Sequence, residues 1–352
     1  MLHFWENLHF GTVDYLALPA TVLLLAALAL AFDFTNGIHD AANSIATVVS
    51  TRVLSPWAAV VWAAFFNFVA FAVFHLRVAS TMGKGLIEPS IVDNTVIAAT
   101  LFSAIGWNIF TWYLGLPTSS SHALTFSLIG VGFAKGGWAI LQWDGIGKTA
   151  LFVILSPLFG ALIGALITIA VMWLFRRTSP RRVDSLFRRG QLLSAAFYSL
   201  GHGGNDAQKT MGIIYVLLIA ANYSSGSQVL SASDPIPTEI VLACHVAMGL
   251  GTLVGGWRIV KTMGQRIIKL RPVDGFCAES GAAVTLTMVI FGGIPVSTTH
   301  TITGAILGVG SLKRFGAVRW GVAANVVWAW ILTIPCTALV AGSLYLLFRR
   351  TV

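Results

Sequence analysis

Long apolar stretches separated by short polar loops dominate the pattern along this chain. A helix needs about 20 apolar residues to cross the hydrocarbon core of a bilayer, so stretches of this kind predict membrane-spanning helices. A membrane β-barrel would instead show short segments of alternating polarity. We therefore predict an all-α polytopic membrane protein with about 10–12 membrane segments. The longest apolar stretches are Ala17–Ala31, Trp57–Phe74, Thr149–Phe175, Ile240–Trp257 and Val318–Phe348.

Four shorter apolar segments occur as two pairs, and each pair is interrupted by glycine or proline. Residues 101–116 and 118–133 flank Pro117, and residues 276–291 and 295–310 flank a Gly-Gly-Ile-Pro turn. Short, interrupted segments at matching places in two halves of a membrane protein indicate a binding site. We predict re-entrant hairpins or broken helices there, because irregular backbone is tolerated inside a membrane only where it lines a cavity.

The composition agrees with a membrane protein and leaves no polar region large enough for a soluble domain. The chain is 56% hydrophobic and 10% charged, whereas an ordinary soluble domain carries about 25% charged residues. The net charge of +9 is concentrated in a few loops, so it indicates membrane orientation rather than a nucleic-acid partner. No Cys-x-x-Cys or His-Glu-x-x-His motif occurs. We therefore expect no metal-ligating residues and no tightly bound cofactor.

Basic residues cluster in loops that we place on the cytoplasmic side, since short cytoplasmic loops are enriched in Lys and Arg. Residues 176–189 hold six arginines, residues 257–271 and 313–319 are also basic, and residues 222–239 contain neither Lys nor Arg. This distribution predicts a multi-pass plasma-membrane protein with its amino terminus outside. Two arginines at 349–350 favour a cytoplasmic carboxyl terminus, but the other loops place that terminus outside.

Two polar motifs occur twice, in the same order, within apolar sequence. Residues 32–43 read FDFTNGIHDAAN and residues 198–209 read YSLGHGGNDAQK. Each is followed by a proline-led motif, PTSSSH at 117–122 and PVSTTH at 295–300. Because matching elements start from opposite sides of the membrane in the predicted topology, the pattern indicates two inverted-topology repeats. The predicted units are a first repeat over 1–175, an arginine-rich cytoplasmic linker over 176–189 and a second repeat over 190–352.

Asp40 and Asp206 are the strongest site candidates, since an intramembrane carboxylate costs about 2.5–3.5 kcal/mol on insertion scales. The alternative role for either aspartate is to cap a helix or to form a structural ion pair. Glycines surround both aspartates and predict that the helix unwinds there. Asn43 and Lys209 follow the aspartates by three residues, which places them on the same helix face. Lys209 is expected either to pair with a carboxylate or an anionic substrate, or to extend its ammonium group to the membrane surface.

The hydroxyl side chains after each proline form a second set of candidates. At the start of a helix, hydroxyls cap free N–H groups, and the same N–H groups and positive dipole end can hold an anion. A simple N-cap and a substrate contact are therefore the two alternatives. Recurrence beside paired aspartates favours the contact. These candidates are Ser119, Ser120, Ser121, Ser297, Thr298 and Thr299.

Histidines and one further carboxylate are weaker candidates. His122 and His300 end the proline-led motifs, and imidazole is the side chain that changes charge near neutral pH. The alternative for each histidine is a structural role, as a hydrogen-bonded residue that packs between helices. Glu279 lies in an apolar segment without a counterpart in the first half. The candidates for the coupling ion or proton are therefore Asp40, Asp206, Lys209, Glu279, His122 and His300.

These motifs resemble those of the inorganic phosphate transporter (PiT) family, in particular its bacterial low-affinity members. The resemblance covers nearly the whole chain, with similar stretches at 32–52, 194–214, 251–271 and 294–310. It implies symport of phosphate with a cation, the bacterial inner membrane as the location, and a homodimer. It places phosphate and cation binding on Asp40, Asn43, Ser119, Ser120, Ser121, Asn205, Asp206, Ser297, Thr298 and Thr299.

The chain departs from the family pattern in both motifs. Residues 37–40 read Gly-Ile-His-Asp and residues 203–206 read Gly-Gly-Asn-Asp, where the commonest family form is Gly-Ala-Asn-Asp. Lys209 stands where the sodium-coupled members typically have a small or amide residue. The resemblance to bacterial members thus implies H⁺ as the coupling cation, with Na⁺ as the alternative. It also implies that a divalent metal can be carried as a complex with phosphate.

The combined expectation is a secondary active symporter, not an enzyme, that imports inorganic phosphate with protons by alternating access. Protons or a phosphate-bound metal would reduce the negative charge at Asp40 and Asp206, so that phosphate binds against the hydroxyls. The alternatives are a sodium-coupled phosphate symporter, a sulfate permease of the same family, and a divalent-metal transporter that uses the histidines. An intramembrane hydrolase with Ser119 or Ser297 as nucleophile is disfavoured, because a nucleophilic triad needs only one copy.

Overall fold

The computed structural model describes residues 9–11, 13–15, 18–225, 230 and 234–350, and within them all regular elements are helical apart from one isolated β-bridge. The helices of the first half are α1 (Ala20–Ser50), α2 (Pro56–Val69), α3 (Arg77–Lys84), α4 (Asn94–Leu114), α5 (Ser120–Gly136) and α6 (Trp143–Leu174). Those of the second half are α7 (Pro180–Ser225), α8 (Thr238–Val254), α9 (Trp257–Lys261), α10 (Pro272–Phe291), α11 (Thr298–Arg314) and α12 (Trp320–Phe348). Short helical turns add η3 (Ala70–Ala72), η4 (Pro89–Ile91), η5 (Gly137–Ile140), η6 (Thr262–Arg266) and η7 (Phe315–Ala317).

Six of the described helices are long and apolar enough to cross a membrane, or up to eight if each of two bent helix pairs forms one span. The bent pairs are α2–α3, with a bend of 85°, and α8–α9, with a bend of 60°. The chain is therefore a multi-span membrane protein. The predicted count of about 10–12 segments is higher than this, because the sequence analysis also counts α7, which carries a polar motif, and the 17-residue α11.

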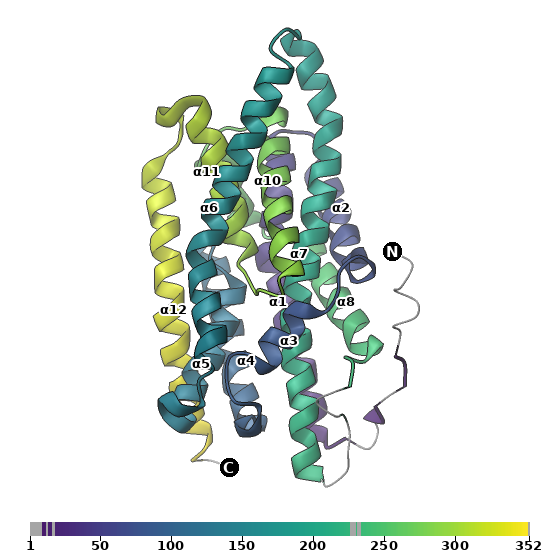
Figure 1. Cartoon of the computed structure of the whole chain (residues 1–352), viewed down its shortest axis with the longest axis vertical. Coiled ribbons are helices and arrows are strands. Elements are labelled where there is room, and N and C mark those ends of the chain that lie inside the picture. Colours follow the sequence, from purple (N-terminus) through teal and green to yellow (C-terminus); the bar gives the residue numbers. More distant parts are fainter. Residues whose placement is uncertain (1–8, 12, 16–17, 226–229, 231–233, 351–352) are drawn as a thin grey trace.

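Two helical hairpins enter the molecule from opposite ends. In Figure 1, α4 and α5 occupy the lower half of the view and α10 and α11 the upper half. Their turns meet, since the rings of His122 and His300, one beyond each turn, have centroids 4.5 Å apart. Each turn contains a glycine with positive φ, Gly115 at 69° and Gly293 at 66°, a conformation that other residues rarely adopt. The interrupted apolar segments thus form hairpins rather than broken helices.

The two long helices α6 and α12 hold these hairpins from outside. α6 packs against α10 and α11, and α12 packs against α4 and α5. Glycines allow the close approach: a Cβ on Gly304 would lie 2.1 Å from the Pro157 carbonyl oxygen, and one on Gly130 would lie 2.3 Å from that of Ala338. The outer faces of α6 and α12 expose large apolar side chains, as helices that face lipid do.

The predicted unwinding at the aspartates is wrong. α1 and α7 continue without a break through both motifs. The glycines instead permit close backbone contact between helices: a Cβ on Gly37 would lie 2.4 Å from the Met248 carbonyl oxygen, and one on Gly203 would lie 2.3 Å from that of Asn67. α8 and α2 can therefore pack directly against the two motif helices, which need no local unwinding to do so.

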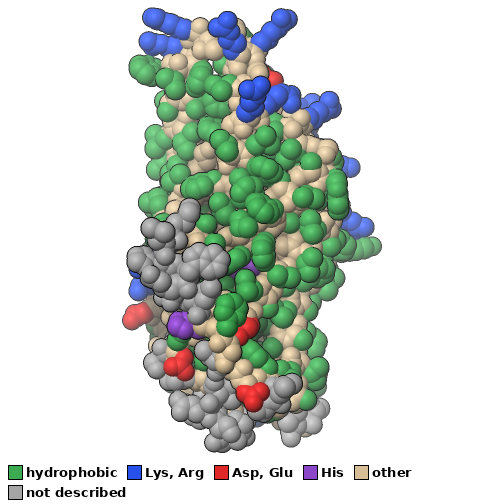
Figure 2. Space-filling model, turned by 90° about the vertical axis from the view of Figure 1, so that its right-hand side faces the viewer, with side chains coloured by type: hydrophobic (Ala, Val, Ile, Leu, Met, Phe, Trp, Pro, Cys, Tyr) green, Lys and Arg blue, Asp and Glu red, His purple; other side chains and the backbone are tan. Residues whose placement is uncertain are grey.

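Charged side chains lie mainly at the two ends of the molecule. Figure 2 shows Lys and Arg gathered at the upper end, a broad hydrophobic band below them, and Asp and Glu toward the lower end. Contacts join the basic loops: Arg188 donates to the Arg52 carbonyl oxygen at 3.1 Å, and the Lys313 ammonium pairs with Asp274. Much of the basic sequence that is assigned to one side of the membrane therefore gathers at one end, but Arg258 does not, since it donates to the Tyr113 carbonyl oxygen beside the central α4–α5 turn. That this end faces the cytoplasm stays a prediction.

Candidate functional site

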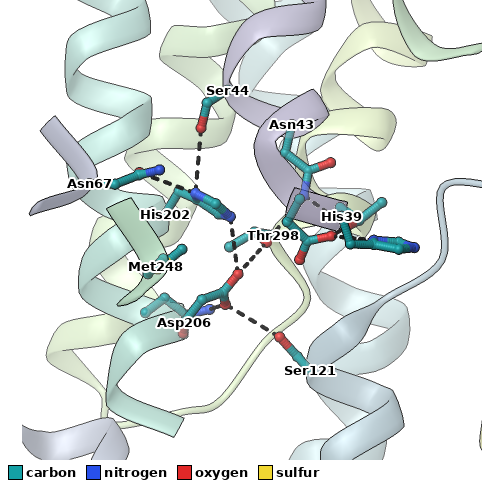
Figure 3. A network of polar contacts seen from close by, with 12 residues as sticks. His39, Asn43, Ser44, Asn67, Ser121, His202, Asp206, Met248 and Thr298 are labelled. Atoms are coloured by element: carbon teal, nitrogen blue, oxygen red, sulfur yellow. Dashed lines mark hydrogen bonds and ion pairs between the residues drawn. The ribbon is translucent and has the colours of Figure 1, made fainter. Parts of the chain in front are cut away.

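Polar side chains of both repeated motifs meet at the centre of the molecule, where α1, α7 and the two hairpin turns come together (Figure 3). α5 begins at Ser120 and α11 at Thr298, so two helix amino termini are placed at this centre. All ten side chains predicted to bind substrate are at most 4% exposed. The fold thus brings the candidates from both halves of the chain into one buried cluster.

Asp206 of α7 accepts hydrogen bonds from both hairpin turns. Its Oδ2 accepts from the Thr298 hydroxyl at 2.9 Å, and its Oδ1 accepts from the Ser121 hydroxyl at 3.3 Å. Oδ1 also accepts from Asn205 Nδ2 at 2.9 Å and from Lys209 Nζ at 2.5 Å. These donors compensate the carboxylate for the water that it loses by burial.

The ammonium group of Lys209 lies in a cage of three oxygen atoms. It donates to Asp206 Oδ1 at 2.5 Å, to the Ser121 hydroxyl at 2.5 Å and to the Val296 carbonyl oxygen at 2.7 Å. Of the two expected roles, pairing with a carboxylate is the one observed. Extension to the membrane surface is wrong, since the side chain is only 2% exposed. An all-oxygen environment of this kind also suits a small hard cation.

Asp40 of α1 has fewer partners than Asp206. Its Oδ1 lies 2.8 Å from His39 Nδ1 and accepts from the Thr299 hydroxyl at 3.4 Å. Its Oδ2 has no hydrogen-bond partner among the described residues. Asn43, one turn further along α1, donates from Nδ2 to the same Thr299 hydroxyl at 2.8 Å. One carboxylate oxygen of Asp40 therefore remains free to accept a hydrogen bond from a ligand.

Five of the six candidate hydroxyls of the proline-led motifs divide into two groups, and the sixth, that of Ser120, has no hydrogen-bond partner among the described residues. Ser119 and Ser297 are N-caps, each of which accepts a hydrogen bond at 3.1 Å from a backbone N–H three residues on. Ser121, Thr298 and Thr299 instead point to the aspartates through the bonds described above. The N-cap alternative is thus realised at Ser119 and Ser297, and substrate contact by the other three hydroxyls stays a prediction.

His122 and His300 contact each other rather than the aspartates. The His300 ring stacks on Trp330, with centroids 3.8 Å apart, and its Nδ1 lies 3.4 Å from the Val153 carbonyl oxygen. Among the described residues, His122 Nδ1 and His300 Nε2 have no hydrogen-bond partner. The pair therefore joins the two hairpins to α12 and α6, beside the carboxylate cluster.

Glu279 of α10 forms a separate buried cluster. It accepts hydrogen bonds from Gln191 Nε2 at 2.9 Å and from the Ser194 hydroxyl, both on α7. Gln191 Oε1 in turn accepts from the Thr51 hydroxyl at 2.8 Å. None of the hydrogen bonds described for Glu279 joins it to Asp40 or Asp206, so the fold does not bring this candidate to the aspartates.

Sequence analysis missed two side-chain contacts of the site: one is local, since His202 precedes Asp206 by four residues on α7, and the other comes from a different element, α2. His202 Nε2 lies 3.2 Å from Asp206 Oδ2, and Asn67 of α2 lies 3.1 Å from His202 Nδ1. Asn67 is the single polar residue of the apolar stretch 57–74, which was a usable signal. Asp40, His202 and Asp206 offer ligand atoms within 4.8 Å of one another and could hold a metal ion. The sequence analysis expects no such set, since its members come from different halves of the chain.

Comparison with known proteins agrees with this architecture. A sequence profile described as "Phosphate transporter family" matches residues 36–341. A probable low-affinity inorganic phosphate transporter of Rhizobium meliloti is 56% identical over 94% of this chain and 97% of its own length. A probable low-affinity inorganic phosphate transporter of Bacillus subtilis is 43% identical over 93% of this chain and 97% of its own length. A solved structure named "The sodium-dependent phosphate transporter" matches 95% of this chain and 100% of its own, with a TM-score of 0.86 at 23% identity.

Proposed function

Because the chain belongs to the phosphate transporter family, we propose that it is a secondary active symporter that imports inorganic phosphate with protons by alternating access. The observation that carries this proposal is the meeting of two hairpin turns over Asp40 and Asp206. Hydroxyls of Ser121, Thr298 and Thr299 converge there with the amino termini of α5 and α11. Helix amino termini favour anions. Phosphate would bind between the turns, in contact with both halves of the chain.

We propose that residues 1–175 and 190–352 are inverted-topology repeats joined by the arginine-rich linker 176–189. The order of elements supports this division, since each half has a motif helix, a bent helix pair, a hairpin and a long outer helix. The hairpins enter from opposite ends (Figure 1), as inversion requires. Movement of the hairpins and outer helices against the motif helices would open the site to each side in turn.

Positive charge must accompany phosphate at this site, because two carboxylates would otherwise repel the anion. Lys209 supplies one such charge from its oxygen cage. This favours protons over sodium, since the ammonium already occupies the place where a sodium ion would contact Asp206. The sodium-coupled alternative is favoured only by the name of the solved relative, and a likeness at 23% identity bears on the fold alone.

A divalent metal carried with phosphate would have suitable ligands here. Asp40, His202 and Asp206 combine two carboxylates and an imidazole, all buried. Oxygen and nitrogen donors of this kind bind Mg²⁺ or other divalent ions that also coordinate phosphate. In this proposal the metal is part of the substrate, and its charge offsets that of the aspartates and the phosphate.

We place the protein in a bacterial plasma membrane with its amino terminus outside. The gathering of most Lys and Arg side chains at one end supports this orientation, with that end in the cytoplasm. The named relatives from Rhizobium meliloti and Bacillus subtilis support a bacterial membrane. The resemblance to the family is the sole support for a homodimer.

Phosphate, and not sulfate, is the expected substrate. A protonated phosphate can donate its P–OH to a carboxylate, such as the free Oδ2 of Asp40, whereas sulfate has no proton to donate at neutral pH. A site that pairs with a substrate hydroxyl rejects an analogue that lacks it by a factor of about 10⁴. Labelled phosphate uptake into proteoliposomes should therefore persist in an approximately tenfold excess of unlabelled sulfate. Equal competition by unlabelled sulfate and unlabelled phosphate would favour the sulfate permease instead.

A further inference from the structure

Asp33 is a buried carboxylate that the site described so far does not use. It lies in α1 and has no exposed surface, and among the described residues neither of its carboxylate oxygens accepts a hydrogen bond of ordinary geometry, although the side chains of Thr210 and Asn36 lie close enough to interact with it. The nearby Thr35 hydroxyl donates to the Phe32 carbonyl oxygen at 2.8 Å and so satisfies a backbone group. Asp206, in contrast, has partners on both oxygens, and Asp40 has partners on one. Asp33 is thus the aspartate of the central region with the fewest donors.

The position of Asp33 joins it to the substrate site. It precedes Asn36 by three residues and Asp40 by seven, so all three lie on one face of α1. α1 packs against α7 and α8, from which Lys209, Asp206 and the thiol of Cys244 interact electrostatically with Asp33. α4, which also packs against α1, carries no charged side chain. The single cation that faces Asp33 among these groups is therefore the ammonium of Lys209.

An ionised carboxylate in such a place is strongly unfavourable, because it has lost its water and the side chains of Thr210 and Asn36 compensate that loss only in part. A neutral carboxylic acid loses far less solvation free energy on burial than a carboxylate does. We infer that Asp33 carries the coupling proton of the transport cycle. This inference rests on the proposed proton symport, and it assigns the proton to a residue outside the phosphate contacts. Asp40 and Asp206 then remain ionised to bind the phosphate or its accompanying cation.

Proton release from Asp33 would act on the site through Lys209. Once the O–H bond of Asp33 breaks and its proton passes to water on the cytoplasmic side, the new carboxylate competes with Asp206 for the ammonium. That ammonium also holds Ser121 and the Val296 carbonyl, one on each hairpin turn. A shift of Lys209 toward Asp33 would loosen both turns together. Proton release and the opening of the phosphate site are thereby coupled.

Asp33→Asn tests this assignment, because an amide imitates the neutral acid but cannot release a proton. The purified full-length protein is reconstituted, and two rates are measured: phosphate uptake driven by an inward proton gradient, and exchange of external labelled phosphate for internal phosphate. We expect gradient-driven uptake to fall at least about tenfold while exchange changes less than about threefold. Asp33→Glu, which retains a titratable group, should restore the gradient-driven uptake. Asp144→Asn, an exposed substitution at the start of α6, should leave both rates unchanged.

Each other result counts against the assignment. Full gradient-driven uptake in Asp33→Asn would overturn it. Loss of both rates in a folded Asp33→Asn protein, without rescue by Asp33→Glu, would show a purely structural role. Folding is checked by the melting temperature, which should equal or exceed that of the wild type because a buried carboxylate is removed. A wild-type protein that does not respond to a proton gradient would instead overturn the proposed symport itself, before any variant is compared.

Discussion

Asp206→Asn is expected to abolish phosphate uptake, with a loss of at least about 100-fold. The amide cannot balance the ammonium of Lys209, which is buried and has Asp206 as its only carboxylate hydrogen-bond acceptor among the described residues. Breaking one partner of a buried ion pair costs about 3–5 kcal/mol, and about 1.4 kcal/mol corresponds to a factor of ten. The amide would also weaken the links to Ser121 and Thr298, so both hairpin turns lose their common acceptor. The measurement is labelled phosphate uptake into proteoliposomes, at matched amounts of inserted protein.

The matched control is Asp184→Asn, which removes a carboxylate from an exposed ion pair with Arg188. Exposed pairs of this kind contribute about 0–1 kcal/mol, so uptake should stay near the wild-type rate. Asp40→Asn, on the other motif helix, is expected to lose uptake as Asp206→Asn does. Normal uptake in both Asp40→Asn and Asp206→Asn would show that phosphate does not bind where we place it.

Lys209→Asn is expected to make phosphate uptake depend on sodium. The substitution removes the ammonium and leaves the oxygens of Asp206, Ser121 and Val296, which suit a small monovalent cation. It also gives α7 the residue that α1 has at the corresponding position, Asn43. We expect stimulation by sodium over choline of at least about tenfold, against none in the wild type. Sodium-dependent protection of the variant against thermal unfolding would provide a second reading of the same site.

Lys135→Asn is the matched control, since it removes a lysine that pairs with Asp93 in a more exposed location. It should not create a response to sodium. If Lys209→Asn keeps proton-driven uptake and gains no response to sodium in either assay, the ammonium of Lys209 does not stand in for a coupling ion.

The sequence predicts much of this architecture because the membrane makes strong demands on it. Apolar stretches must be helical where backbone groups cannot reach water, and the doubled motifs indicate Asp40 and Asp206 as site candidates without a structure. The short segments around Pro117 and Pro295 are also too interrupted for simple spans, and they form the two hairpins.

What the sequence does not reveal depends on which helix lies opposite. Gly37 and Gly203 look like points of unwinding until Met248 and Asn67 are seen against them. The contact of His202 with Asp206 follows from their four-residue spacing on α7. The contact of His202 with Asn67, which lies on α2, does not follow from local spacing. Such contacts are tertiary, so a single sequence supplies the candidates but not their neighbours.

Tertiary structure also decides which hydroxyls of the proline-led motifs cap a helix and which ones contact an aspartate. Ser119 and Ser121 stand in one motif and share one side-chain chemistry. Ser119 caps a helix while Ser121 reaches Asp206, because the first turn of α5 directs them differently. Sequence analysis could not tell which hydroxyl caps its helix and which one reaches an aspartate.

Uptake of radiolabelled phosphate into proteoliposomes with the purified wild-type protein tests the central claim most directly. An inward proton gradient is compared with an inward sodium gradient, each with and without magnesium. The account predicts that the proton gradient accelerates uptake and that the sodium gradient does not. Acceleration by sodium alone would contradict proton symport and would make the aspartates ligands of a sodium ion.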